Sequence, residues 1–241
     1  MVNIFDDALE VKMGRLLETE GLKGMRKTWL MGACLSATLL SGCALAPVVV
    51  GGTALTTATV MTDRRTAGTI LNDEVLEKRV SYDITQALPH RDLHVTVTAY
   101  EGKVLLTGEV PTTADKQRVE STARAVQSVT SVVNELAVAE NASVSARLSD
   151  SLLATKVRSR ILATEKISLN QMKVTVDRGI VYLMGVVSGQ EAKTASNVVA
   201  SVSGVRKVVT VFTVLSDAEI AQRMKDLKAV SDSEAERNLS Q

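Results

Sequence analysis

Aromatic residues are scarce in this sequence, with one Trp, three Tyr and two Phe in 241 residues. A site that stacks bases or sugar rings needs several aromatic side chains on one surface, so the composition argues against such a site. The charges almost cancel, because 28 Lys and Arg face 27 Asp and Glu. This balance argues against attachment to nucleic acid through bulk positive charge, and we expect no nucleic-acid partner.

Metal-binding and catalytic residues are also few, since the chain has two Cys and two His. His90 and His94 have a spacing that suits a metal only on a helix, but Pro89 and the strand pattern that follows place them in a loop and a strand. The sequence has neither a G-x-S-x-G nucleophile elbow nor a glycine-rich phosphate loop. We expect no enzymatic activity, no metal and no cofactor.

The beginning of the chain has the features of a targeting signal. Met25 is followed by Arg26 and Lys27 and then by an apolar run, 29–40, that is shorter than the roughly 20 residues of a membrane-spanning helix. The run ends in Leu40-Ser41-Gly42-Cys43, which resembles a bacterial lipobox. The alternatives are a buried Cys at the end of an ordinary helix, or Cys34 as the lipidated residue, whose apolar run would be too short.

This reading divides the first 69 residues. Residues 1–24 are an N-terminal extension, whose translation is open because Met25 looks like the natural start, and residues 25–42 are a lipoprotein signal peptide. Cys43 then carries a diacylglycerol and an N-acyl chain such as palmitate. Ala44, which is not the Asp that retains enteric lipoproteins in the inner membrane, permits export to the outer membrane. Residues 43–69, rich in Thr, Ala, Gly and Val, form a flexible tether.

The rest of the chain is an internal repeat with a spacing of 77 residues that later becomes 76. Leu71-Asn72-Asp73 matches Leu148-Ser149-Asp150, and Gly102 and Gly108 match Gly179 and Gly185. Each copy has a helix with apolar residues at every fourth position, two alternating strands joined by a Gly-containing turn, a second helix and a β-branched strand. The second helices are expected at about 113–126 and 190–202, and the last strands at about 130–138 and 207–215.

The order α-β-β-α-β predicts an α+β fold of two tandem modules, 70–139 and 148–215. A right-handed β-α-β crossover places both helices of a module on one face of a three-stranded mixed sheet. Residues 216–241 are expected to form a tail with a short helix-like stretch, 218–229, and a disordered end.

Each module resembles the BON domain, whose pattern is V-x-V-x-x-x-x-G-x-V-x-L-x-G-x-V followed by a helix and G-V-x-x-V. The residues that fit are Val97, Gly102, Val104, Leu106, Gly108 and Val110 in the first copy, and Val174, Gly179, Val181, Leu183, Gly185, Val187, Gly204, Val205 and Val208 in the second. The first copy departs from this pattern at Ser128, where the second has Gly204, so the last turn of the first copy can differ from that of the second.

The arrangement of two BON modules behind a lipobox resembles the dual-BON outer-membrane lipoproteins, the DolP-like group. The segments Asp63-Arg64-Arg65 and Thr155–Ser159 strengthen this resemblance. The resemblance implies a non-enzymatic protein, lipid-anchored in the outer membrane of a Gram-negative bacterium and facing the periplasm. It also implies that the second BON domain binds anionic phospholipids such as phosphatidylglycerol and cardiolipin, and that the protein supports envelope integrity.

A comparison of the two copies indicates where the second copy would touch a membrane. Leu152 and Leu162 lie away from the helix stripe that both copies share. Copy one has Thr85, Ser81 and Asp83 at the positions that correspond to Leu162, Arg158 and Arg160. We therefore expect a basic, partly apolar outer face on copy two and not on copy one. The predicted phospholipid-binding residues are Leu152, Thr155, Lys156, Arg158, Ser159, Leu162 and Lys166.

Other interpretations of this face and of the protein stay open. The face can be an ordinary solvated one with two incidental leucines, or it can pack against copy one. The protein can instead be an adaptor for outer-membrane assembly proteins, through sheet edges or the helix face of copy one. It can also be a periplasmic stress or chaperone-like protein, as OsmY-type tandem BON proteins without a lipid anchor suggest.

Overall fold

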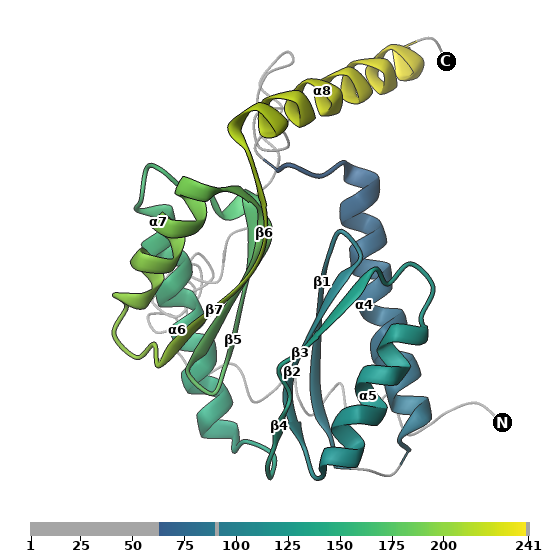
Figure 1. The fold of residues 1–241 in the computed structure, drawn as a ribbon, viewed down its shortest axis with the longest axis vertical. Coiled ribbons are helices and arrows are strands. Elements are labelled where there is room, and N and C mark those ends of the chain that lie inside the picture. Colours follow the sequence, from purple (N-terminus) through teal and green to yellow (C-terminus); the bar gives the residue numbers. More distant parts are fainter. Residues whose placement is uncertain (1–62, 90–91, 240–241) are drawn as a thin grey trace, which may run out of the picture. The chain divides into compact units, whose positions relative to one another are not determined.

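The computed structural model describes residues 63–89 and 92–239. The predicted signal peptide, Cys43, His90 and the tether up to residue 62 lie outside the described residues. Figure 1 labels the elements, which are, in chain order, α4 (Ala67–Ala87), β1 (His94–Tyr100), β2 (Lys103–Val110), α5 (Thr113–Ala125), β3 (Ser131–Asn134), β4 (Ala137–Val138), α6 (Val144–Leu162), the 3-10 helix η2 (Leu169–Gln171), β5 (Met172–Asp177), β6 (Ile180–Ser188), α7 (Gly189–Ala200), β7 (Lys207–Leu215) and α8 (Asp217–Leu239).

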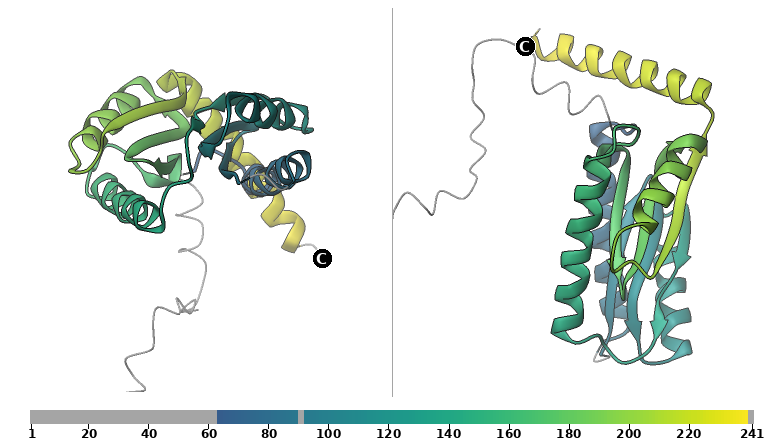
Figure 2. Two further views of the ribbon diagram at one scale, coloured as in Figure 1. Left: turned by 90° about the horizontal axis from the view of Figure 1, so that it is seen from below. Right: turned by 90° about the vertical axis from the view of Figure 1, so that its left-hand side faces the viewer.

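Both repeats have the predicted α-β-β-α-β order and sheet arrangement. In the first, β2 pairs antiparallel with β1 and parallel with β3 and with its short continuation β4. In the second, β6 pairs antiparallel with β5 and parallel with β7 along nine residues. The two helices of each repeat cover one face of its sheet, as the right-hand view of Figure 2 shows for α6 and α7. The α+β fold class is therefore confirmed.

Each repeat buries its own aliphatic core between helices and sheet. In the first helices, the residues at every fourth position that the sequence marked are buried: Leu76, Val80 and Ile84 in α4, and Leu153, Val157 and Ile161 in α6. Alternate strand residues such as Val104 and Leu106 face these helices and are fully buried. The cores thus contain almost no aromatic rings, as the composition requires.

The hairpin turn of each repeat is held by an aspartate from the first helix. Both turn residues have positive φ, Glu101 and Gly102 at 52° and 74° in the first repeat. Asp73 accepts hydrogen bonds from the backbone N–H groups of both, at 2.9 and 3.1 Å. Asp150 accepts the equivalent bonds in the second repeat, at 2.7 and 2.9 Å. The repeated Asp therefore fixes the helix against its hairpin.

The turn before the last strand does not differ between the repeats. Ser128 has φ of 75° and Gly204 has φ of 102°, so both occupy the left-handed region. The serine therefore adopts the conformation that glycine adopts more readily, and the departure from the BON pattern changes the residue and not the turn.

The sheet faces that the helices leave uncovered share a third apolar cluster with residues from both repeats. It consists of Tyr100, Leu105, Tyr182, Met184, Val186 and Val211. Polar contacts join the same repeats, including Lys173 Nζ to Glu77 Oε1 at 2.8 Å and a 3.2 Å bond between the hydroxyl groups of Thr98 and Thr175. The repeats therefore pack on each other through their sheets, and their helices are left outermost.

Two predicted segments need correction at their ends. The predicted tether stops earlier, because Asp63–Thr66 are packed and α4 begins at Ala67, where the Thr66 side chain caps it. The tail after Ser216 is one helix, α8, that continues to Leu239 and not a short helix with a disordered end (Figure 1). Its Ala, Glu, Lys and Arg content favours helix, and Ile220, Met224 and Leu227 recur at helical spacing on a partly buried face.

Candidate membrane-binding surface

Helix α6 carries a stripe of exposed apolar side chains on the side opposite its core residues. Leu152 and Leu162 are 58% and 71% exposed, as the sequence predicted for them. Val144 and Leu148 are 84% and 61% exposed and extend the stripe toward the start of the helix. With 3.6 residues per turn, these four side chains lie on one face. We call Val144, Leu148, Leu152 and Leu162 the α6 stripe.

The sequence-based prediction missed Val144 because it began the second module at residue 148, and it used Leu148 only as a marker of the repeat. The helix begins four residues earlier, where the Ser143 hydroxyl accepts a hydrogen bond from the N–H of Ala146 at 3.2 Å. Ser and Asn residues just before 144 were the available signal for this N-cap.

The other predicted phospholipid-binding residues are all exposed, but they do not share one surface. Thr155 and Ser159 lie along the α6 stripe. Arg158 lies on one flank and donates a hydrogen bond to the backbone oxygen of Val174 at 3.0 Å, whereas Lys156 lies on the opposite flank. Lys166 follows the end of the helix at Leu162. The structure thus groups the apolar and hydroxyl residues and places the bases around them.

Helix α4 in the first repeat also has exposed apolar residues, which corrects one expectation. Leu71, Val75 and Tyr82 are 60%, 48% and 63% exposed and lie opposite the core residues of α4. Leu71 and Val75 are the counterparts of Leu148 and Leu152. An apolar outer face is therefore common to both repeats, because the first helix of each carries apolar residues outside the core pattern.

Charge still separates the two faces. Helix α6 contains four bases and one acid, a net charge of +3, whereas α4 contains two bases and four acids, a net charge of −2. An apolar stripe flanked by bases suits a surface of anionic phospholipid, and one flanked by acids does not.

A groove of about 550 Å³ lies beside α6, but its charges do not favour an anion. Lys156, Arg178 and Arg206 line it together with Glu109, Glu140 and Asp150, so bases and acids are equal in number. Burial, followed by the nearby charge of Glu109, raises the pKa of Asp177 beside it. The stripe and not the groove is therefore the candidate contact for an anionic surface.

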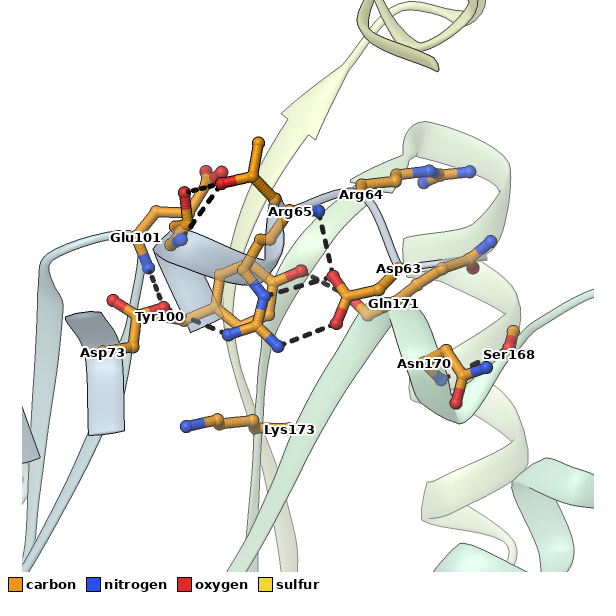
Figure 3. A network of polar contacts seen from close by, with 12 residues as sticks. Asp63, Arg64, Arg65, Asp73, Tyr100, Glu101, Ser168, Asn170, Gln171 and Lys173 are labelled. Carbon is orange, nitrogen blue, oxygen red and sulfur yellow. Dashed lines mark hydrogen bonds and ion pairs between the residues drawn. The ribbon is translucent and has the colours of Figure 1, made fainter. Parts of the chain in front are cut away.

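The segment Asp63-Arg64-Arg65, which we call the clasp, contacts both repeats where the predicted tether ends. Figure 3 shows the contacts of its Arg65 with Asp63 and Asp73. Arg64 donates two hydrogen bonds to the Glu191 carboxylate at 2.7 and 2.9 Å, and one to the backbone oxygen of Val186 at 2.9 Å. Arg65 binds Asp63 and Asp73 and lies 4.0 Å from the ring centroid of Tyr100. One arginine thus fixes the second repeat and the other fixes the first.

Helix α8 is attached to the same place. Arg223 donates a hydrogen bond to the backbone oxygen of Arg64 at 2.6 Å and forms an ion pair with Glu101. The clasp therefore joins the chain ahead of the first repeat to both repeats and to the C-terminal helix.

Within residues 63–89 and 92–239, the structure contains no helix long and apolar enough to cross a bilayer. The same residues include no cluster of three or more His, Cys, Asp or Glu side chains arranged for a metal. His94 lies 3.3 Å from the buried carboxylate of Glu109.

The family model of the BON domain matches residues 72–140 and 149–216. The chain belongs to the BON-domain family. The two repeats are accordingly BON1 and BON2, and their matched ranges agree with the two modules that the sequence predicted. The α6 stripe belongs to BON2 and the exposed face of α4 to BON1.

Similar proteins align with this chain over most of their own length. The chain is 36% identical over 142 residues to the "21 kDa hemolysin" of Actinobacillus pleuropneumoniae, covering 58% of this chain and 73% of the relative. It is 37% identical over 142 residues to the "Outer membrane lipoprotein DolP" of Haemophilus influenzae, covering 58% and 74%. The solved C-terminal domain of CdsD of Chlamydia trachomatis aligns at 14% identity with a TM-score of 0.24, over 56% of this chain and 96% of that one.

Proposed function

We propose that this protein is a lipoprotein of the periplasmic face of the outer membrane, anchored through acylated Cys43, whose BON2 domain binds anionic phospholipid through the α6 stripe. The relative from Haemophilus influenzae is named as an outer membrane lipoprotein, and Leu40–Cys43 supplies a matching lipobox. The protein would act without catalysis, as a membrane-bound support of the envelope.

The α6 stripe is the observation that carries the lipid-binding part of the proposal. Four large apolar side chains that are more than half exposed lie on a helix of net charge +3. Such side chains enter the boundary between headgroups and acyl chains, while Lys and Arg remain at the phosphates. Each base near an anionic surface contributes about 1 kcal/mol, so binding should be weak and sensitive to salt.

The acyl anchor would make weak binding sufficient. An anchored domain searches only the volume within reach of its tether, so its effective concentration at the membrane surface is about millimolar or higher. The clasp would limit that search further, because it fixes the end of the tether to both BON domains.

The experiment compares vesicle binding by residues 53–241, which contain both domain cores and lack Cys43. Leu152→Asp together with Leu162→Asp should weaken binding to phosphatidylglycerol vesicles by about 30-fold or more, since about 2 kcal/mol of apolar transfer is lost. The matched control, Leu71→Asp with Tyr82→Asp on α4, should bind as the wild type does. Unchanged binding by the α6 variant would disprove lipid binding through this stripe.

The exposed face of α4 supports a second candidate function, that of an adaptor for outer-membrane assembly proteins. Leu71, Val75 and Tyr82 form an apolar face with an aromatic residue on a helix of net charge −2, which suits a protein more than an anionic bilayer. A photo-crosslinker at Leu71 in cells tests this candidate. A protein partner that disappears with Tyr82→Asp but persists with Leu162→Asp would support it.

A further inference from the structure

The last strands of the two BON domains differ in how their free edges are closed. β3 and β4 in BON1, and β7 in BON2, each pair with one neighbour in the described structure and leave the opposite edge unpaired. The two strands occupy the same register, since Lys103 faces Ser131 and Ile180 faces Lys207. Positions in the two edges can therefore be compared directly, 76 residues apart.

Side chains cover the unpaired edge in BON1. Glu135 and Ala139 donate their backbone N–H groups to β2, so alternate residues such as Val132 and Leu136 direct theirs away from the sheet. The N–H of Leu136 donates to Asn134 Oδ1 at 3.2 Å, and its oxygen accepts from Lys116 Nζ at 2.6 Å. Arg124 reaches the oxygen of Val132 at 3.4 Å.

BON2 has lost all three covering side chains. The counterparts of Lys116, Arg124 and Asn134 are Ala192, Ala200 and Thr210, none of which can reach a backbone group in the same way. The outward-facing backbone groups of β7 belong to Val208, Thr210, Phe212 and Val214. Within the described part of the chain, no side-chain hydrogen bond reaches any of them.

The strand β7 also lacks the usual protection of an edge. Its nine residues, KVVTVFTVL, include no Pro, Gly or acidic residue, and the only charge is Lys207 at the first position. Thr210 is exposed and Val214 is 55% exposed. A long, β-branched and regular edge of this kind is a template for another strand.

We infer that β7 of BON2 is an interaction edge that pairs antiparallel with β7 of a second copy of this chain. Pairing about Val211 places Thr210 opposite Phe212 of the second copy, and Val208 opposite Val214. All four residues present outward-facing backbone groups, so the hydrogen-bonding residues coincide in this register. The two three-stranded sheets then form one continuous sheet.

Charge complementarity at both ends favours a second copy. The exposed Arg206 and Lys207 precede the strand, and the exposed Asp217 follows it. Antiparallel pairing about Val211 brings the basic start of one strand beside the acidic residue after the other, and twofold symmetry repeats the contact at the opposite end.

The edge can be closed again with the residues that close it in BON1. In the full chain in detergent, Ala192→Lys with Thr210→Asn would cap the backbone of Phe212 as Lys116 and Asn134 cap Leu136. Sedimentation should show a concentration-dependent dimer for the wild type and at least about a tenfold weaker one for this variant. The control, Asn197→Lys, adds the same charge at an exposed site of α7 and should dimerise as the wild type does.

A photo-crosslinker at Val214 in native membranes identifies the occupant of the edge. It should yield a covalent dimer joined near Val208, whereas the same group at Val138, the BON1 counterpart of Val214, should not. A wild-type chain that stays monomeric, a dimer unaffected by the capping variant, or a crosslink from Val214 to a different protein would each overturn the inference. None of these results depends on lipid binding by the α6 stripe.

Discussion

The two aspartates that hold the hairpins allow a direct test of the forces that stabilise each BON domain. Asp73 is 2% exposed and accepts three hydrogen bonds, one from Arg65 and two from the turn of its hairpin. Asp150 is partly exposed and, among the residues that the structure describes, accepts only the two bonds from the turn. Replacement of each by Ala removes the same chemical group from equivalent positions in different surroundings.

The two replacements should differ in magnitude. A hydrogen bond to a charged group contributes about 1.5–3 kcal/mol when buried and less when water competes, so Asp150→Ala should cost about 1–2 kcal/mol. Asp73→Ala should cost about 3–5 kcal/mol, because it also leaves a buried arginine with one partner fewer. The gain in helix propensity from Asp to Ala is the same in both helices and cancels in the comparison.

The assay is urea denaturation of residues 53–241, with hydrogen exchange of the two hairpins to assign the loss to a domain. Faster exchange should appear at Glu101 and Gly102 in one variant, and at Arg178 and Gly179 in the other. Equal costs for the two variants, or a larger cost for Asp150→Ala, would refute the argument that burial and Arg65 set the difference.

Two further predictions concern a tight glycine and the clasp. Gly185→Ala should destabilise the protein by more than about 2 kcal/mol, because its Cβ would lie 2.2 Å from the backbone oxygen of Gln171, whereas Gly189→Ala, with open space around it, should be neutral or stabilising in thermal unfolding. Burial alone would raise the pKa of Glu191, but the hydrogen bonds and charge of Arg64 outweigh it and hold that pKa below its ordinary value of 4.5. The ionised Glu191 therefore stabilises the fold above that value, and this stabilisation is lost as the pH falls through the lower folded pKa. The urea midpoint should fall more steeply between about pH 5 and pH 3 in the wild type than in Glu191→Gln. Parallel curves for the two proteins would contradict this reasoning.

The sequence predicts the architecture well because the repeat supplies two independent readings of one module. Residues that recur in both copies have the same structural role, as Asp73 and Asp150 do in binding the hairpin turn of their repeat. The ends of the modules were less predictable. Val144 lies outside the repeated pattern, and α8 has no counterpart in the repeat that would mark where it ends.

The sequence predicts only part of the candidate site, because some of its features depend on contacts between distant residues. Exposure of Leu152 and Leu162 follows from helical geometry alone, and the structure confirms it. The hydrogen bond from Arg158 to β5 and the joining of two domains by Arg64 and Arg65 depend on contacts between residues far apart in the chain. Such contacts leave no periodic signal in the sequence.

Amide chemical-shift mapping of residues 53–241 with phospholipid bicelles tests the proposed lipid binding most directly. With phosphatidylglycerol, the largest shifts should fall on Leu148, Leu152, Thr155, Ser159 and Leu162 of α6, and they should fade when salt is added or when phosphatidylcholine replaces the anionic lipid. Shifts centred on α4, or none with either lipid, would contradict the proposal.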